Sequence, residues 1–311
     1  MALSSCAQPP KNMNTTLISD LYKEVKHRGK AVQYHAGIQV GGCAFEFFVN
    51  DLPVVQYFEN GNGALNTSAP INDHILKSGT QTWKLVLYPA YLKGIQTEPL
   101  SKGIEANIEI ETLKFREDGV DNIAPTFSLI ETPKKKNEKG DTVYAEAGKK
   151  IMVYEGTFQA IVPYELKGWS QSVDLRKEDS PKLLQEVITA YQEYISILKD
   201  KDAQKVAEKV YKKERECAQA YFMDEEATKD RWNNYKTIFT IDGLELQSLE
   251  HYQMKIYGDG RIVCLERTDY PNINEPAIRA RYKDEKGRGQ VEYYYYYLHR
   301  PQPSSKLEII R

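Results

Sequence analysis

The sequence predicts an α+β protein of two domains: an N-terminal antiparallel β-sandwich, and C-terminal helices packed on a curved antiparallel sheet. Short stretches that alternate apolar and polar residues dominate the chain from residue 30 to about 166. Apolar residues then recur at helical spacing from residue 181, and period-two alternation returns near residue 246. These two changes of period separate an all-β part from a mixed part.

The length of 311 residues allows two domains of ordinary size, each with its own core. We assign residues 1–29 to a tether and a short helix at 15–27, residues 30–166 to the sandwich and residues 181–311 to the mixed domain. The polar stretch 167–180 is the predicted linker. Because the pattern changes abruptly across this linker, the two halves are expected to fold independently.

Strands of the first half are read from alternation and from turn residues between them. The clearest is WKLVLY at 83–88, and the glycines Gly41-Gly42 separate two others. The expected strands are 31–40, 43–50, 52–58, 83–88, 104–115, 127–130, 150–154 and 157–162. Many short strands at this spacing are typical of a sandwich.

The second half begins with three predicted helices. Ser180 before Pro181 suits an N-cap followed by proline at the first helical position, and residues 200–202 break that helix. Further helices are expected at 203–222 and 225–235. The strands expected after them are 236–241, 246–257, 261–269, 277–284 and 290–299, with a short one at 306–311.

Two features organise the predicted C-terminal sheet. Gly258-Asp259-Gly260 is suited to a tight hairpin turn that requires positive φ. Five consecutive tyrosines occupy positions 293–297, and successive side chains of a strand point to opposite faces. One set is expected to be buried against the helices and any pocket, and the other to stay open to a partner. We assign the binding role to Tyr294 and Tyr296.

Helices followed by a curved antiparallel sheet, with a long helix ending in the charged break at 200–202, resemble the nuclear-transport-factor-type cone fold, which ketosteroid isomerases share. The resemblance implies a pocket between helices and sheet, which in the enzymes holds an Asp base and a Tyr donor. Carboxylates near the predicted sheet are Asp242, Glu245, Glu250, Glu266 and Asp269. No motif places any of them, so we assign no catalytic residue.

The N-terminus Leu3-Ser4-Ser5-Cys6 resembles the lipobox of bacterial lipoproteins, in which a small residue precedes a cysteine that is acylated. The basic and apolar segment that usually stands upstream is missing. The tail at 7–16, rich in Pro, Asn and Thr, suits a flexible tether. The resemblance implies lipidation of Cys6, a membrane anchor, and a location in the cell envelope, on the periplasmic side or the cell surface. The alternative is a cytoplasmic protein with an ordinary N-terminus.

Several classes of site lack a sequence signal. The net charge of −2 and a pI of about 6.3 do not indicate a basic groove for nucleic acid. No apolar run approaches the ~18 residues of a membrane span. The five histidines and four cysteines show no metal-ligand spacing, and Cys43, Cys217 and Cys264 are expected to be buried free thiols. We therefore expect no metal, no cofactor and no nucleic-acid partner.

The function expected from these observations is non-enzymatic: a lipid-anchored cell-envelope protein that binds a protein partner or a small ligand. One specific version is an immunity protein that neutralises a secreted toxin. Two alternatives stay open. The first is an enzyme of the ketosteroid-isomerase or dehydratase type that uses the C-terminal pocket. The second is a carbohydrate-binding protein in which Trp83 and Tyr88 of the sandwich are aromatic platforms.

Overall fold

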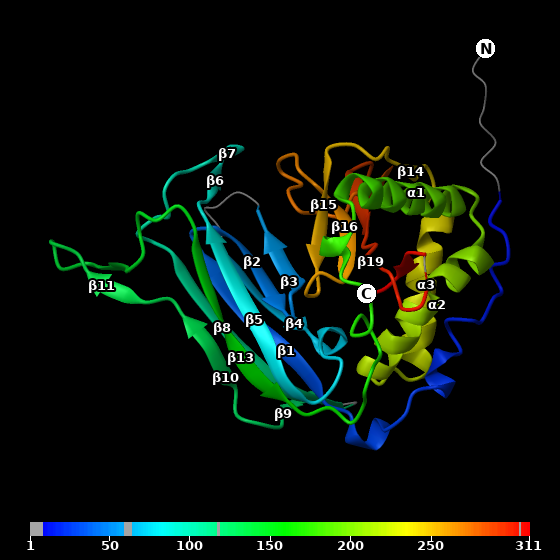
Figure 1. Cartoon of the computed structure of the whole chain (residues 1–311), viewed down its shortest axis with the longest axis horizontal. Helices are drawn as coiled ribbons and strands as arrows, with labels where there is room; N and C mark the ends of the chain where they lie inside the picture. Colours follow the sequence, from blue (N-terminus) through cyan, green and yellow to red (C-terminus); the bar gives the residue numbers. More distant parts are fainter. Residues whose placement is uncertain (1–8, 59–63, 117–118, 305) are drawn as a thin grey trace, which may run out of the picture. The chain divides into compact units, whose positions relative to one another are not determined.

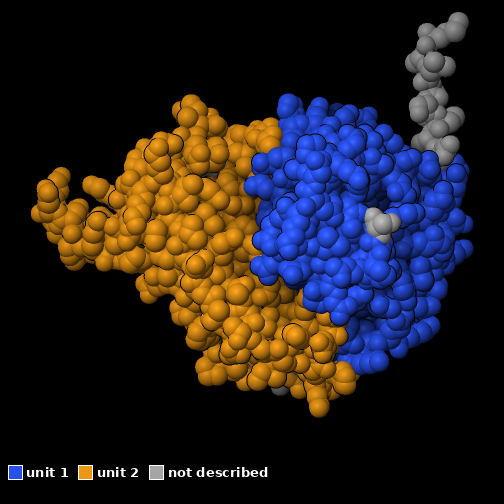
Figure 2. Space-filling view, viewed as in Figure 1, with its two compact units in different colours: residues 1–26, 167–267, 276–311 blue, residues 27–166, 268–275 orange. Residues whose placement is uncertain are grey.

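The computed structural model describes residues 9–58, 64–116, 119–304 and 306–311, and the chain is mixed α+β. Its strands form several antiparallel sheets, and three α-helices lie in the C-terminal part. The chain divides into two compact units, coloured separately in Figure 2. The helical unit comprises residues 1–26, 167–267 and 276–311, and the strand unit comprises residues 27–166 and 268–275. Independent folding of the two halves stays a prediction.

The strand unit contains two larger antiparallel sheets (Figure 1). The first has the order β10-β8-β1-β4 with β9 paired to β8, and the second has the order β13-β5-β2-β3. Bounds in the first sheet are β1 Gln33–Gly41, β4 Ala64–Pro70, β8 Glu105–Arg116, β9 Gly119–Asn122 and β10 Phe127–Glu131. Bounds in the second are β2 Ala44–Val49, β3 Leu52–Tyr57, β5 Gly79–Tyr88 and β13 Met152–Ala160. Two small pairs are β6 Tyr91–Leu92 with β7 Ile95–Gln96, and β11 Lys134–Lys136 with β12 Thr142–Tyr144.

Most predicted strands of this unit are confirmed, with one correction. The strands predicted at 150–154 and 157–162 form the single strand β13, which pairs with β5 without a break. Gly156 makes this continuity possible, because a Cβ there would lie 2.9 Å from the indole nitrogen of Trp83. The glycine therefore marks a close approach between strands and not an end of one.

Three helices form one layer of the helical unit: α1 Ser180–Lys199, α2 Ala203–Ala220 and α3 Glu225–Thr240. Each begins after an aspartate, Asp179, Asp202 or Asp224, whose side chain accepts a hydrogen bond from the backbone N–H three residues later. The predicted cap at Ser180 is thus wrong by one residue. None of the described helices is both long and apolar enough to cross a membrane.

Helix α3 is longer than predicted. Residues 236–241 were expected to form a strand, but the helix continues to Thr240. Ile238 and Phe239 are buried and follow the buried Trp232 at six and seven residues, so they extend the same apolar helical stripe. The β-forming character of Ile238 and Phe239 is outweighed by their packing in the core of the helical unit.

The strands of the helical unit form a sheet β14-β17-β18 and a sheet β15-β16-β19-β20. Their bounds are β14 Glu245–Leu246, β15 Tyr252–Tyr257, β16 Ile262–Arg267, β17 Ile278–Lys283, β18 Gly289–Tyr294, β19 Leu298–His299 and β20 Glu308–Ile309. The predicted hairpin is confirmed: Tyr257 pairs with Ile262, and Gly258, Asp259 and Gly260 have φ of 61°, 53° and 86°. Figure 1 shows the helices gathered beside β15 and β16.

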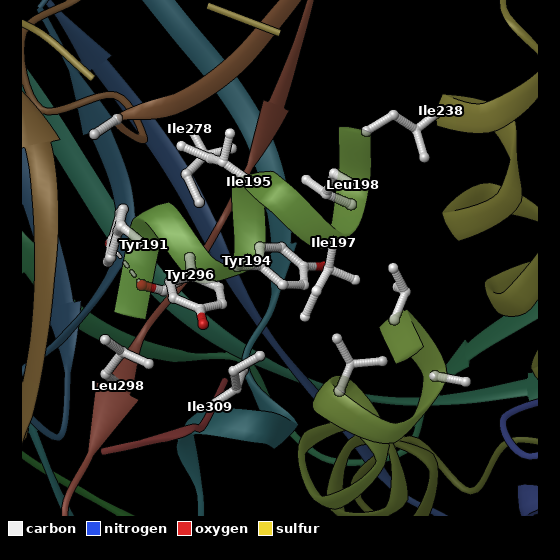
Figure 3. Close-up of a cluster of buried hydrophobic side chains, with 14 of the residues drawn as sticks. Tyr191, Tyr194, Ile195, Ile197, Leu198, Ile238, Ile278, Tyr296, Leu298 and Ile309 are labelled. Atoms are coloured by element: carbon white, nitrogen blue, oxygen red, sulfur yellow. Dashed lines mark hydrogen bonds between the residues drawn. The ribbon is translucent and has the colours of Figure 1, made fainter. Parts of the chain in front are cut away.

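The tyrosine run does not form one long strand. β18 ends at Tyr294 in the first sheet, and β19 begins at Leu298 in the second. Between them the hydroxyl of Tyr191 accepts a hydrogen bond from the Leu265 N–H at 2.8 Å and donates one to the Tyr296 carbonyl at 2.6 Å. A side chain of α1 therefore stands between two backbones, and the rings of Tyr191, Tyr194 and Tyr296 gather in the core (Figure 3).

The segment before residue 27 packs with the helical unit. It contains a single 3₁₀ turn at Leu21–Lys23 where a short helix was predicted. Ile18 and Leu21 are buried in the same core as the helices, and the Asn12 side chain donates to Asp202 at 2.9 Å. The segment therefore belongs to the helical unit and not to the strands that follow it in sequence.

Candidate functional site

A cavity of about 210 Å³ lies inside the helical unit, between its three helices and the tyrosine run. Aromatic and charged side chains come together in its lining. Those that matter for its chemistry are Tyr194 from α1, Lys213 from α2, Arg231 and Tyr235 from α3, and Tyr294 and Tyr296 from the tyrosine run. Their arrangement depends on the packing of the helices on β18.

One wall of the cavity is aromatic. The ring of Tyr296 stacks on Tyr194 with centroids 4.6 Å apart and meets Tyr191 edge to face at 4.8 Å. Tyr296 is 5% exposed, and its hydroxyl donates to the Ala190 carbonyl at 3.3 Å. Tyr294 is half-buried, and burial raises the pKa of its hydroxyl, which stays protonated at neutral pH. This wall is fixed by packing.

Three of the lining residues, Lys213, Arg231 and Tyr235, contact a buried carboxylate that does not itself line the cavity. Glu214 is 1% exposed and accepts hydrogen bonds from Arg231 Nε at 2.8 Å, from Arg231 Nη2 at 3.2 Å and from the Tyr235 hydroxyl at 2.6 Å. Burial alone would raise the pKa of Glu214, but the charges of Lys213 and Arg231 and these hydrogen bonds outweigh it and hold the pKa below its usual value. Glu214 is therefore an ionised structural anion.

Three lining side chains have hydrogen-bonding capacity to spare. The ammonium of Lys213 lies 3.8 Å from Glu214 Oε1, and the side chain is 10% exposed. Within the described ranges, neither this ammonium nor the hydroxyls of Tyr194 and Tyr294 make a hydrogen bond to another side chain or to the backbone. Both oxygens of Glu214 are already occupied, so the ammonium has at least two N–H groups left for a ligand.

The arrangement suits binding more than proton abstraction. A general base needs a carboxylate whose pKa is raised toward the working pH, and the pKa of Glu214 is lowered. None of the five carboxylates that the sequence pointed to lines the cavity. Glu266 is buried but accepts from the Tyr257 hydroxyl at 2.9 and 3.0 Å, while Asp242, Glu245 and Glu250 are exposed. The cavity offers one ammonium, two phenols and stacked rings.

The residues predicted for binding fall into two groups. Tyr294 and Tyr296 line the cavity, as do Tyr293 and Tyr295, but the latter two are also open to solvent, at 37% and 60% exposure. Tyr293 and Tyr295 are thus the more exposed set, and a role of Tyr294 and Tyr296 in binding a partner stays a prediction. Tyr296 is less exposed because its ring packs against α1.

The aromatic platforms proposed for the strand unit are not open. Trp83 is 7% exposed, and the half-buried Tyr88 donates its hydroxyl to Glu46 Oε2 at 2.6 Å. Trp83 is thus buried, and a sugar-binding role of the half-buried Tyr88 stays a prediction. Cys6, the predicted lipidation site, lies outside the described residues.

Sequence reasoning missed Lys213, Glu214, Arg231 and Tyr235. A signal was available for the first two, because they follow the buried Val210 by three and four residues and precede Cys217 by four and three. That places two opposite charges on the apolar face of α2, where charged groups need partners. Arg231 carries no comparable signal, since its helix position is partly exposed.

Thiols and potential metal ligands are the remaining groups that could carry chemistry. Cys43, Cys217 and Cys264 are buried free thiols, as predicted. Among the residues that the structure describes, no three His, Cys, Asp or Glu side chains gather so that they could hold a metal ion. No protein-family model, curated protein sequence or solved structure matches this chain.

Proposed function

We propose that the protein is a binding protein that holds a small aromatic carboxylate in the cavity of the helical unit. The observation that supports this proposal is the Lys213 ammonium, which lines an aromatic cavity and whose one polar partner among the described residues is Glu214, at 3.8 Å. A buried charge is costly unless it is paired and hydrogen-bonded, so a ligand anion would complete its coordination.

The size and walls of the cavity limit the ligand. A volume of 210 Å³ holds about seven waters at ~30 Å³ each, and it is below the ~300–1,000 Å³ of pockets for larger ligands. Stacked Tyr194 and Tyr296 favour a flat ring. A single substituted aromatic ring with one carboxylate fits these requirements. The Tyr294 hydroxyl supplies a further donor or acceptor for a ring substituent.

The spare N–H donors of Lys213 favour an anion over a cation at this position. Lys213 and Arg231 supply two positive charges, and Glu214 between them supplies one negative charge. Arg231 uses two of its nitrogens on Glu214, which leaves Lys213 as the group available to a ligand. Glu292 is a carboxylate that lines the cavity, and it accepts from the Tyr282 hydroxyl at 3.3 Å.

The test is titration calorimetry of the full chain with benzoate, 4-hydroxybenzoate and the corresponding uncharged amides. We expect the carboxylates to bind more tightly than the amides, and Lys213→Met to weaken the binding at least tenfold. Lys212→Met is the matched control, because Lys212 is the next residue of α2 and pairs with Glu308 at 2.6 Å on the outside. Absence of binding by the wild type, or equal binding by wild type and Lys213→Met, would refute the proposal.

The cellular role that we propose rests on the sequence pattern. A chain lipidated at Cys6 would hold such a binding unit at the cell envelope, and an immunity protein against a secreted toxin is the specific version. Stable anchoring needs more than one acyl chain, which lipoprotein processing supplies. Fatty-acid labelling of the natural gene product tests this, with Cys6→Ala as the variant and Cys217→Ala as the control. Equal labelling of wild type and Cys6→Ala would refute lipidation at Cys6.

We also propose the finer architecture. Packing of the two larger sheets of the strand unit as a sandwich is supported by the buried residues on one face of each, including Ile38, Ile108, Phe47 and Leu85. A cone-like arrangement of the helical unit is supported by a cavity between three helices and short antiparallel strands. An experimental structure would test both.

A further inference from the structure

A second recess, independent of the cavity in the helical unit, lies on the first sheet of the strand unit. It is a groove of about 500 Å³ lined by residues of β4, β1, β8 and β10. In β1 the residues Ala36, Ile38 and Val40 are buried at 0–2% exposure, so the alternate positions 33, 35, 37, 39 and 41 point to the other face. The groove lies on that outer face.

One glycine of β1, Gly41, lines the groove. Gly37 and Gly41 flank Gln39 on the outer face of β1, the inner strand of the sheet between β8 and β4. A Cβ at position 37 would lie 3.0 Å from Glu109 Cγ, so the glycine allows the Glu109 side chain to lie across the strand. Glycine inside a strand weakens it and often marks a place where a ligand approaches the backbone. At position 37 that space is taken by the Glu109 side chain, whereas Gly41 lines the groove with no side chain of its own beside Gln39.

A row of polar side chains crosses the groove. In the strand register Gln39 pairs with Asn66 on β4 and with Asn107 on β8, and Asn107 pairs with Glu131 on β10. All four residues line the groove. Neighbouring strands are ~4.8 Å apart, so the row is about 14 Å long. Within the described ranges, no hydrogen bond occupies any of these four side chains.

We infer that this groove binds a neutral oligosaccharide through the row Asn66–Gln39–Asn107–Glu131. Each amide offers donors and an acceptor, and the carboxylate accepts, which matches the paired donor and acceptor character of sugar hydroxyls. Lys134, the lysine that lines the groove, is paired with Glu105 at 3.0 Å, and Glu131 adds a negative charge. An anionic ligand such as a phosphate is therefore disfavoured. No aromatic side chain lines the groove, which disfavours a stacked nucleobase.

The length of the row favours an oligomer over a single sugar. Hydrogen-bonding groups on four adjacent strands extend over about 14 Å, which is longer than one sugar ring. A chain of two or more units could contact all four side chains at once. Binding is expected to be modest, because hydrogen bonds to neutral groups are exchanged for hydrogen bonds to water.

The experiment uses the full chain on an array of neutral cello-, xylo-, malto-, manno- and chito-oligosaccharides, followed by calorimetry with the strongest. We expect at least one series to bind, with affinity increasing from the monosaccharide to the longer members. Gln39→Ala and Asn107→Ala should each weaken binding by about 3- to 10-fold. Gln33→Ala is the matched control, because residue 33 lies on the same face of the same strand about 20 Å away.

Three outcomes would overturn the inference. The wild type shows no binding to any oligosaccharide of the array; or Gln33→Ala weakens the binding as much as Gln39→Ala; or a lysine-rich peptide binds the groove residues and no saccharide does. Thermal unfolding of each variant shows that the fold is retained, and Asn66→Ala is a second variant in the row if one of the others is unstable. Benzoate binding at Lys213 should be unchanged by all of these substitutions, so the two proposals fail separately.

Discussion

The Tyr191 hydroxyl donates a 2.6 Å hydrogen bond to the carbonyl oxygen of Tyr296 in the core of the helical unit. The same hydroxyl accepts from the Leu265 N–H, so one phenol oxygen satisfies two buried backbone groups that no ladder bond reaches. Burial raises the pKa of Tyr191 well above its usual value, which keeps the donor proton in place at every working pH. This contact is where the tyrosine run passes from one sheet to the other.

Removal of this hydroxyl should be costly. Tyr191→Phe leaves the Leu265 N–H and the Tyr296 carbonyl unpaired, and we expect the free energy of unfolding to fall by about 2–4 kcal/mol. Tyr194→Phe is the matched control, because the Tyr194 hydroxyl makes no hydrogen bond within the described residues, and a change below about 1 kcal/mol is expected. Urea unfolding measures both. Equal losses in the two variants would contradict the bridging role.

The two faces of the tyrosine run should differ in stability. Tyr296→Ala removes a ring that is 5% exposed and should destabilise the protein by about 3–5 kcal/mol. Tyr295→Ala removes a ring that is 60% exposed, and a change within about 1 kcal/mol is expected. A protein partner that uses the open face should lose affinity with Tyr295→Ala. Thermal unfolding distinguishes the two variants, and a reversed order would show that the faces are misassigned.

The ion pair of Arg231 with Glu214 should be needed for stability as well as for the cavity. Arg231→Met leaves a carboxylate that is 1% exposed with one cation fewer, at a cost of about 3–5 kcal/mol. The control is Arg215→Met. Arg215 lies on the exposed side of α2, with its guanidinium 6.0 Å from the centre of the Tyr211 ring. The substitution should change stability by less than about 1 kcal/mol. Chemical unfolding at pH 7 is the measurement, and similar losses for both arginines would contradict the prediction.

Acid should weaken the helical unit through His299. Burial lowers the pKa of His299 to about 4, and the ring Nδ1 lies 2.7 Å from the Ser172 hydroxyl. An unfolded histidine has a pKa of about 6.5, so the unfolded state binds the proton first as the pH falls. Stability is therefore complete above pH 6.5 and declines from there to pH 4, by about 3 kcal/mol from this group.

His299→Asn should remove this share of the pH dependence while keeping a polar group near Ser172. The measurement is the free energy of unfolding of wild type and variant at several values between pH 4 and 7. His27 is exposed, so His27→Asn is the control and should leave the profile unchanged. If the wild-type and His299→Asn profiles run parallel over this interval, the assignment to His299 is wrong.

The segment 268–275 should stabilise the strand unit to which it belongs. Asn274 donates to the buried carboxylate of Glu46 at 2.9 Å, and the ring of Tyr270 stacks on Tyr91 at 5.2 Å. Asn274→Ala removes one of the donors to Glu46 and should cost about 1–3 kcal/mol. For the same reason an isolated fragment 27–166 should be less stable than the same residues in the full chain. Equal stability of fragment and full chain would contradict this.

Local patterns in the sequence predicted much of the fold. The hairpin at Gly258–Gly260 and the helices were visible because turn residues and apolar periods are local properties. The end of α3 and the break after Tyr294 were not, because both depend on what the residues pack against. Ile238 and Phe239 have the character of strand residues, but in the folded protein they pack in the core as part of a helix. The Tyr191 hydroxyl contacts the tyrosine run although it is 105 residues away in sequence.

For the same reason, the sequence indicated only some of the residues that form the cavity. Tyr294 and Tyr296 belong to a conspicuous run, whereas Lys213 and Glu214 are two charges in a helix that is rich in charges. Their spacing from Val210 and Cys217 places them on the apolar face of α2, but their partners Arg231 and Tyr235 lie on a different helix. In the strand unit, Gly37 and Gly41 around Gln39 were read as turn or strand residues, and the register that aligns Gln39 with Asn66 and Asn107 is a long-range property.

The assignment of residues 268–275 to the strand unit has a consequence for synthesis. The ribosome completes Leu166 and must add 275 − 166 = 109 further residues before that segment exists. At about 5–20 residues per second this takes roughly 5–20 s. During that time a nascent strand unit exposes Glu46 without Asn274 and Tyr91 without Tyr270. The strands synthesised first therefore lack the contacts of residues 268–275 until that segment is made. Chaperones that bind nascent chains would bind the strand unit in that interval.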